Sequence, residues 1–514
     1  FNNFTKGTLK LGAILIGMVI ALFWKDQKSA KSGITYTSKK VLQLAVVLLG
    51  FGLNLNVVLQ TGKQSLPIII CTIATSLLAA FAFAPLWRNA EPGCGRVLTL
   101  GLFGALAFLP SGWAAYTLRV YRDNIFPALC LYFFAGMAGM ALRAVFTPEK
   151  PLWPWLAAAG AGLACGYLDR EDAGLFLLPF AAAATVIVAV VLAGKRRWKA
   201  LAAQVIPYVM LGVGVLTFCT LNYTHYGVFA LSDFSEGSFA AAMGAMMRVD
   251  TDSTAPYLSV PADAREKTYD AVPELEPLAY WLEEDAQLQN DFRDPNLDDY
   301  RAGSFYWAIR RAAQFEGIYD SAQTADAYWQ NVADKINAAC DAGTLPSRTG
   351  KRVATSQPIK AEYVGATLAE TWKGFWHVLG FKDCQPYENL RSIGTTDDIA
   401  AWSGYLHCGF NNAAVAGEDT PYYSPYQKAV FAVMQAWTAV YSVVLTVCVL
   451  CAVLFRLIHL FTNLRKKHTA ETVVPWLLLF GIFGIALLRC AMIAFVEVSS
   501  FGIGTSTMYL ATVH

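Results

Sequence analysis

Apolar residues in this chain gather in long runs, a pattern that predicts membrane-spanning helices. A helix needs about 20 residues to cross a hydrocarbon core roughly 30 Å thick. Ten runs approach or exceed that length: 9–24, 41–59, 66–86, 97–116, 125–146, 152–168, 173–194, 200–220, 429–459 and 473–497. The predicted fold class is therefore an all-α membrane protein with about ten transmembrane helices.

Residues 222–427, between the eighth and ninth runs, have the pattern of a mainly helical domain outside the membrane. Apolar residues recur there at four-residue spacing, as they do along one face of a helix: Tyr328, Val332, Ile336 and Cys340. Thr324 is the expected N-cap of this helix and Gly343 its stop signal. Ser253–Glu276, with its prolines and charges, predicts a loose loop.

The runs divide the chain into four parts. Residues 1–83 predict three transmembrane helices, and residues 84–221 predict a bundle of five. Residues 222–427 form the inserted domain, and residues 428–514 contain the last helices. We expect both ends to be cut, because Phe1 stands where Met is usual and a further apolar run reaches the C-terminus.

Charge is distributed unevenly between these parts. Residues 222–427 contain 29 acidic against 15 basic residues, whereas the rest of the chain contains 25 basic against 9 acidic. Cytoplasmic loops accumulate Lys and Arg. One orientation places 17 basic residues in cytoplasmic segments and about five in short outer ones, so we expect the 222–427 domain to be extracytoplasmic. Its acidity argues against a nucleic-acid partner.

The most concentrated polar group near the spans is Asp169-Arg170-Glu171-Asp172, between the sixth and seventh runs. Four ionisable side chains at the mouth of a span can bind a metal, hold a phosphate through the arginine, or supply a general base. A second polar loop, containing Arg119 and Arg122, is predicted on the same outer side. The alternative is a solvated loop whose internal ion pair contributes about 0–1 kcal/mol.

The N-terminal part contains a specific motif. Val41–Asn56 has the sequence VLQLAVVLLGFGLNLN. Residues 8–83 resemble the amino-terminal part of a proposed bacterial sulfate exporter family of the UPF0324 type, whose members share a run similar to LLQLGIVLLGFGLNL. This resemblance implies an anion transporter. The glycine- and serine-rich signature that the family carries next is absent, and Ala90–Arg96 and another plain span follow instead.

Residues 84–514 resemble bacterial polytopic glycosyltransferase-like membrane proteins, in which a Thr-Arg-Glu-Glu-Gly motif opens a span. Arg170, Glu171 and Asp172 match that motif, whereas Asp169 replaces its Thr and Ala173 intrudes before the glycine. The resemblance implies transfer of a sugar from a polyprenyl-phosphate donor. Such an enzyme needs a carboxylate to deprotonate the acceptor and cations to stabilise the leaving phosphate.

On this hypothesis Glu171 or Asp172 is the catalytic base, and Arg119, Arg122 and Arg170 bind the phosphate. The family usually carries its catalytic acid in the first outer loop, whereas residues 60–65 contain no carboxylate. We therefore expect the chain to combine pieces of two proteins joined near residue 84.

Two further features concern the last span and the metal-binding residue types. Arg489 and Glu497 lie about two helical turns apart inside an apolar run, where a functional role is one hypothesis. The alternative is that Glu497 lies at the outer interface and that Arg489 faces the bundle interior. Cys340, Cys384 and Cys408 permit one disulfide in the inserted domain and leave one thiol over. Neither His377 nor His407 has a partner at zinc-ligand spacing, so we expect neither a metal nor another cofactor.

Three functional hypotheses follow, in this order. The first is a multi-pass protein of the bacterial cytoplasmic membrane that transfers sugar from a lipid-linked donor to an extracytoplasmic acceptor. The second is an anion transporter of the sulfate exporter type. The third is a non-catalytic membrane protein whose outer domain binds a partner. All three share the lipid bilayer as a partner.

Overall fold

The computed structural model describes residues 94–107, 109–110, 125–170, 172–234, 236–384, 397, 400–401, 425–463, 469–502, 504, 509–510 and 513. The chain forms two compact units, residues 1–107 and residues 108–514. In the first unit the structure describes helix α5 (Cys94–Ala107). The predicted spans 9–24, 41–59 and 66–86 lie outside the described residues.

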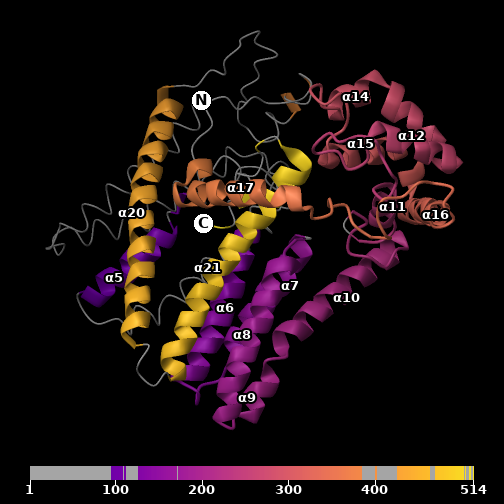
Figure 1. Ribbon diagram of the computed structural model, residues 1–514. Helices are drawn as coiled ribbons and strands as arrows, with labels where there is room; N and C mark the ends of the chain where they lie inside the picture. Colours follow the sequence, from indigo (N-terminus) through magenta and orange to yellow (C-terminus); the bar gives the residue numbers. More distant parts are fainter. Residues whose placement is uncertain are drawn as a thin grey trace, which may run out of the picture. The chain divides into compact units, whose positions relative to one another are not determined.

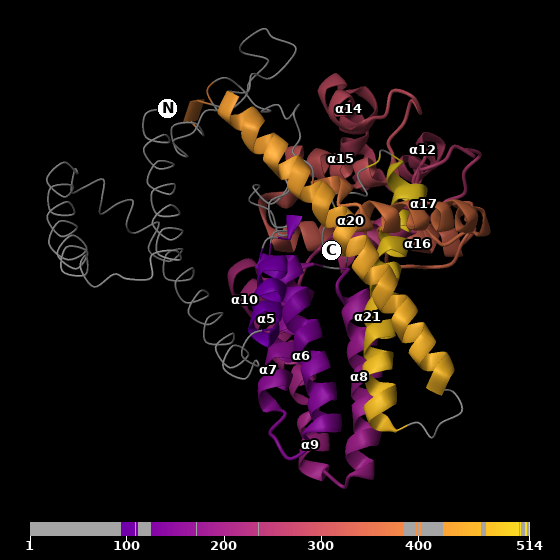
Figure 2. The same cartoon turned by 90° about the vertical axis from the view of Figure 1, so that its left-hand side faces the viewer.

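A bundle of helices forms the apolar part of the second unit. Its members are α6 (Phe126–Phe146), α7 (Trp153–Asp169), α8 (Gly174–Gly194), α10 (Ile206–Tyr226) and α21 (Ala470–Val496). α6 contacts α7, α8 and α21, while α10 packs on α7 (Figures 1 and 2). The short helix α9 (Trp198–Ala203) leads into α10. Phe133, Leu156 and Leu177 lie in the buried core of the bundle.

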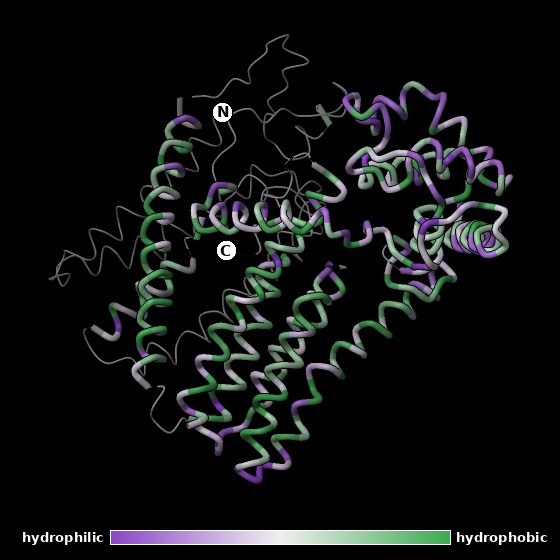
Figure 3. Tube along the Cα trace, in the orientation of Figure 1, coloured by the Kyte–Doolittle hydropathy of each residue, from purple (hydrophilic) through white to green (hydrophobic). Residues whose placement is uncertain are grey.

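Five helical segments among the described residues are long and apolar enough to cross a membrane: Phe126–Phe146, Gly174–Gly194, Trp198–Tyr226, Lys428–His459 and Ala470–Phe501. Hydrophobic residues dominate them along their length (Figure 3). α7 has 17 residues and is shorter. The prediction of a multi-pass, all-helical membrane protein is thus confirmed, whereas the count of ten spans stays a prediction.

Glycines bring α6 and α7 into backbone contact. A Cβ atom on Gly162 of α7 would lie 2.5 Å from the backbone N of Phe133 and 2.8 Å from the carbonyl O of Leu129. A Cβ atom on Gly136 of α6 would overlap the backbone of Ala159. Membrane helices associate through such small residues, because lipid supplies no hydrophobic drive between apolar helices.

We expect Gly136→Ala to destabilise the bundle by about 1–3 kcal/mol, because the added methyl group forces two backbones apart. Gly212→Ala in α10 is the matched control. Nothing lies within 4 Å of a Cβ atom there, and an alanine in an open helical position is more favourable than glycine by up to about 1 kcal/mol. The midpoint temperature of thermal unfolding in detergent should therefore fall for Gly136→Ala and rise for Gly212→Ala. Equal shifts would contradict the close packing.

A second, more polar set of helices lies between α10 and α17. It comprises α11 (Ser238–Met246), α12 (Ala262–Ala271), η5 (Pro273–Leu275), α13 (Glu276–Ala279), η6 (Tyr280–Glu284), α14 (Ala286–Phe292), α15 (Ala302–Phe315), η7 (Ile318–Asp320) and α16 (Ala322–Asp341). These helices share one buried core that contains Phe239, Phe305 and Trp329. The described part of the predicted inserted domain is therefore helical. Its extracytoplasmic location stays a prediction.

The helix predicted around Tyr328 is α16. Val332, Ile336 and Cys340 are buried on one face, as their spacing predicts. The predicted N-cap at Thr324 is wrong, because Ser321 caps the helix and its side chain accepts a hydrogen bond from the Thr324 backbone N–H at 3.0 Å. Gly343 follows the helix end with φ +74°, the left-handed conformation that favours glycine. Cys340 carries a free thiol.

The loose loop predicted for Ser253–Glu276 is also wrong. Helix α12 occupies Ala262–Ala271, and its residues Ala264, Arg265 and Thr268 are buried. Local sequence gives little indication of this helix because it is highly charged. Long-range ion pairs of Arg265 hold it in the core, as shown by its contacts with Glu283 and Asp299.

Helix α21 is joined directly to this domain. It continues into η9 (Glu497–Phe501), and the Phe501 carbonyl accepts a hydrogen bond from Arg301 Nη1 at 2.6 Å. Arg301 also pairs with Asp294. Helices α17 (Ala361–Leu379) and α20 (Pro425–Asn463) complete the unit: α17 packs on α21, and its C-terminal Leu379 carbonyl accepts a hydrogen bond from Thr446 of α20 at 3.3 Å.

Candidate functional site

The turn between α7 and α8 carries the predicted polar cluster. α7 ends at Asp169, and Arg170 leaves the helix with extended backbone angles while its N–H still bonds to the Gly166 carbonyl at 3.2 Å. The Arg170 carbonyl accepts the N–H of Ala173 at 3.2 Å, which closes the turn before α8 begins at Gly174. Arg170 and Asp172 are thereby placed at the end of the bundle.

Asp172 joins two arginines that are far apart in sequence. Arg170 Nε donates to Asp172 Oδ1 at 3.0 Å, and Arg170 Nη2 donates to Oδ2 at 3.4 Å. Arg489 of α21 donates from Nη1 to the same Oδ2 atom. The structure therefore connects the turn between α7 and α8 to α21 through one shared carboxylate.

Aromatic rings surround the two guanidinium groups. Arg170 lies over the rings of Phe126 and Tyr509, each at 5.4 Å from the ring centroid. Arg489 lies over the ring of Phe176 at 5.3 Å. Phe126 and Phe176 contact each other edge to face at 6.1 Å. Such contacts stabilise a cation with little water nearby, each by about 0.5–2 kcal/mol.

The electrostatics of Asp172 favour its ionised form. Burial by itself raises the pKa of Asp172, but the charges and hydrogen bonds of Arg489 and Arg170 outweigh it, so that the pKa lies below its ordinary value. A carboxylate held in this way is a weak proton acceptor. Its clearest physical role is to hold the two arginines in place.

Arg489 retains unused donors. Its side chain is only 3% exposed, and its Nε and Nη2 atoms are buried without a hydrogen-bond partner among the described residues. Buried donors are nearly always satisfied, so each one without a partner requires an explanation. Asp172, by contrast, is 30% exposed, so solvent reaches the cluster from the Asp172 side.

The other predicted site residues are only partly tested. Glu171, Arg119 and Arg122 lie outside the described residues. Arg489 and Glu497, which share a span, have separate partners: Glu497 accepts a hydrogen bond from the Gly504 N–H at 2.6 Å. Sequence reasoning missed the pairing of Arg489 with Asp172, although a charge inside an apolar run was the signal that could have pointed to it.

Within the residues that the structure describes, no three His, Cys, Asp or Glu side chains come together closely enough to hold a metal ion. The arginine cluster can instead hold an anion, because a guanidinium group offers several N–H donors in a fixed planar arrangement.

Known proteins resemble this chain at its N-terminal part. A family model described as conserved hypothetical protein 698 matches residues 4–89. A UPF0324 membrane protein of Streptococcus pyogenes serotype M3 is 40% identical over 132 residues, which cover 25% of this chain and 38% of that protein. UPF0324 membrane proteins of Streptococcus mutans (59% identical over 69 residues) and Fusobacterium nucleatum (55% over 73) cover 20% and 21% of their own lengths.

These similarities support the resemblance predicted for residues 8–83. The chain spans less than two fifths of the length of these relatives, so it shares only a piece of them. The family model ends at residue 89, and none of the three relatives is named as a glycosyltransferase. No solved structure matches the chain. What is shown is a multi-pass membrane protein with a UPF0324-like N-terminal segment.

Proposed function

We propose that this chain is a membrane transporter of small oxyanions and that Arg489 is a binding residue of its second unit. The observation that carries the proposal is the buried guanidinium group of Arg489, whose Nε and Nη2 donors lack a partner among the described residues. An oxyanion such as sulfate supplies acceptors for two parallel N–H donors.

Asp172 determines which donors of the two arginines remain open to an anion. It contacts both arginines and leaves the Nε and Nη2 donors of Arg489 uncommitted among the described residues. Charged residues inside a bilayer commonly line ion pathways, where they pair with each other until an ion takes over some of their bonds. The site lies between α8 and α21, two predicted spans that contact each other.

Residues 4–89 are similar to UPF0324 membrane proteins. The resemblance of residues 8–83 to the proposed sulfate exporters of that type favours transport over sugar transfer. Anion transport therefore replaces the glycosyltransferase hypothesis as the leading proposal. We further propose that residues 222–427 face the outside of the bacterial cytoplasmic membrane, because the opposite orientation would place most loop arginines and lysines outside. With residues 222–427 outside, the arginine cluster is at the outer end of the bundle.

The test is efflux of radiolabelled sulfate from liposomes that contain the full chain. We expect efflux above that of protein-free liposomes, and we expect Arg489→Met to lower it by about 10-fold to 100-fold, because a hydrogen bond to a charged group contributes about 1.5–3 kcal/mol. Arg489→Lys should give an intermediate rate, since a lysine keeps the charge but loses the planar pair of donors.

Arg456→Met is the matched control, because Arg456 lies on α20, another predicted span, and not in the cluster. It should leave the rate unchanged. Size-exclusion chromatography of each variant separates lost binding from lost folding. Absence of sulfate efflux, or equal loss in the Arg489 and Arg456 variants, would overturn the proposal.

A second candidate is transfer of sugar from a polyprenyl-phosphate donor, with Glu171 or Asp172 as base and Arg119, Arg122 and Arg170 as phosphate-binding residues. One observation favours it: Arg170 and Arg489 converge where the phosphate of such a lipid would approach the end of the bundle. The arginine pairs of Asp172 make Glu171 the better candidate base. The same preparations, given a radiolabelled donor, distinguish the two functions. Sugar transfer that is lost in Glu171→Gln, by a protein that shows no sulfate efflux, supports only the second function.

A further inference from the structure

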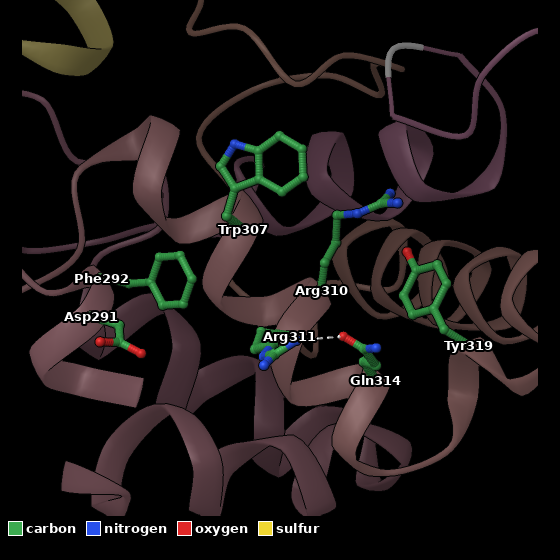
Figure 4. A pocket seen from close by; sticks show the side chains of 7 residues that line it. All are labelled: Asp291, Phe292, Trp307, Arg310, Arg311, Gln314 and Tyr319. Carbon is green, nitrogen blue, oxygen red and sulfur yellow. Dashed lines mark hydrogen bonds between the residues drawn. The ribbon is translucent and has the colours of Figure 1, made fainter. Parts of the chain in front are cut away.

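An open pocket of about 590 Å³ lies on the helical domain, away from the arginine cluster of the bundle. Its walls come from α14, α15 and η7: Asp291, Phe292, Trp307, Arg310, Arg311, Gln314 and Tyr319. Figure 4 shows Trp307 and Phe292 on one side, Arg310 and Tyr319 on the other, and Arg311 with Gln314 between them. The volume falls within the range of pockets that bind small molecules.

Trp307 forms an exposed aromatic platform in this pocket. Its side chain is 55% exposed although it is large and apolar. One face of the indole stacks on Phe234, with the ring centroids 5.2 Å apart and the planes inclined by 20°. The ring is thus supported from behind, and it borders the pocket in front. A rigid aromatic face of this kind binds flat apolar surfaces at a small entropic cost.

The base of the pocket is held rigid by Arg310. Its Nη1 donates to Asp233 Oδ2 at 2.7 Å, and its guanidinium lies 4.9 Å from the ring centroid of Tyr319 and 5.0 Å from that of Phe239. Tyr319 also accepts a hydrogen bond from Trp329 Nε1 at 3.0 Å. These contacts commit the charge of Arg310 to Asp233, so it is not an isolated anion-binding group.

The polar rim carries both donors and acceptors. Arg311 Nη1 donates to Gln314 Oε1 at 2.9 Å, which leaves the Gln314 amide N–H groups and the other Arg311 donors directed to solvent or ligand. Asp291 is exposed and has no ion-pair partner among the described residues. The charges of Arg311 and Asp291 offset each other, so the rim favours a ligand rich in hydroxyl groups over one with a net charge.

We propose that this pocket binds a neutral oligosaccharide. The C–H face of a pyranose ring is flat and apolar and fits the Trp307 indole, while its hydroxyl groups both donate and accept, as the side chains of Asp291, Arg311 and Gln314 require. A quaternary ammonium ligand fits the pocket less well, since it has no acceptor for the N–H donors of Arg311 and Gln314. The inference does not depend on the anion site.

The test is isothermal titration of the full chain in detergent with three soluble probes: chitotetraose, cellotetraose and maltotetraose. We expect at least one to bind, and we expect Trp307→Ala to weaken its binding at least about tenfold, because exposed aromatic anchors dominate such contacts. Trp307→Phe should retain part of the affinity. Gln314→Ala should weaken binding less than Trp307→Ala does.

Trp372→Ala is the matched control, since Trp372 is 60% exposed and lies on α17 outside the pocket. It should leave binding unchanged, and thermal unfolding of each variant will show that the fold is intact. Three outcomes would overturn the proposal: no probe binds, the two tryptophan variants lose affinity equally, or tetragalacturonate binds more tightly than every neutral probe and loses its affinity in Arg311→Gln.

Discussion

Arg265→Met is expected to lower the free energy of unfolding of the helical domain by about 3–5 kcal/mol, the usual cost of removing one partner from a buried ion pair. Arg265 is fully buried. Its Nε and Nη2 donate to Glu283 at 2.7 and 3.0 Å, and its Nη1 donates to Asp299 at 2.7 Å and to the Val260 carbonyl at 3.0 Å. Its removal leaves the Asp299 carboxylate buried without a cation.

The pKa of Arg265 reflects the competition between burial of its charge and its contacts with two carboxylates. Burial lowers this pKa, but the hydrogen bonds and charges of Glu283 and Asp299 outweigh the burial, so that the pKa is raised above its ordinary value. The guanidinium also lies 5.2 Å from the ring centroid of Tyr300 and 5.7 Å from that of Phe305. Arg265 therefore ties α12 to both a carboxylate pair and the aromatic core.

Hydrogen exchange measured by mass spectrometry on the full chain checks this prediction, because it reports α12 and α15 separately from the membrane helices. Arg348→Met, which removes an exposed arginine from the same domain, should change stability by no more than about 0.5 kcal/mol. The double variant Arg265→Met with Asp299→Asn should be more stable than Arg265→Met alone. If the double variant is no more stable, lost packing and not the unpaired charge explains the effect.

The second large effect is expected at Asp172. Asp172→Asn leaves Arg170 and Arg489 buried without their shared carboxylate, at a cost of about 3–5 kcal/mol. Adding Arg489→Met to Asp172→Asn should restore part of the loss, because the buried charge of Arg489 then disappears together with the carboxylate that it contacts. Thermal unfolding in detergent and exchange of the α8 and α21 amides provide the measurement. Additive losses in the double variant would show that the two residues do not interact.

The same pair predicts the direction of a pH effect. The pKa of Asp172 is lowered in the folded protein, so its contribution to stability is complete above the ordinary value of 3.8 and is lost as the pH falls through the lower folded value. Wild-type stability should therefore fall more steeply than that of Asp172→Asn below about pH 4. Parallel curves for the two proteins would contradict the paired state of Asp172.

Much of the helical architecture could be predicted from local patterns. The runs at 125–146 and 173–194 coincide with α6 and α8, because a span must be continuously apolar and the sequence records this directly. The buried face of α16 likewise follows from four-residue spacing. For the candidate site, the sequence pointed to the turn that carries Arg170 and Asp172, whereas the contact of Arg489 with Asp172 could not be predicted from it.

The errors have a common physical cause. The prediction gave a loop at α12 because Arg265 of this helix pairs with Glu283 and Asp299 outside it, and local periodicity cannot include such partners. The N-cap was predicted at Thr324 instead of Ser321 because both side chains are good caps, and only the backbone geometry selects between them. Propensity is a weak guide wherever distant side chains supply the compensating interactions.

Hydropathy, motif and charge are properties of contiguous residues. They were enough to predict a helical membrane protein with a UPF0324-like N-terminal segment and a polar domain inserted between spans. The folded structure was needed to show that Arg489 contacts Asp172, 317 positions away, and that Trp307 borders an open pocket. The Arg489 contact and the Trp307 pocket depend on which helix faces pack together. Contacts between segments far apart in the sequence set this packing, and local patterns do not reveal them.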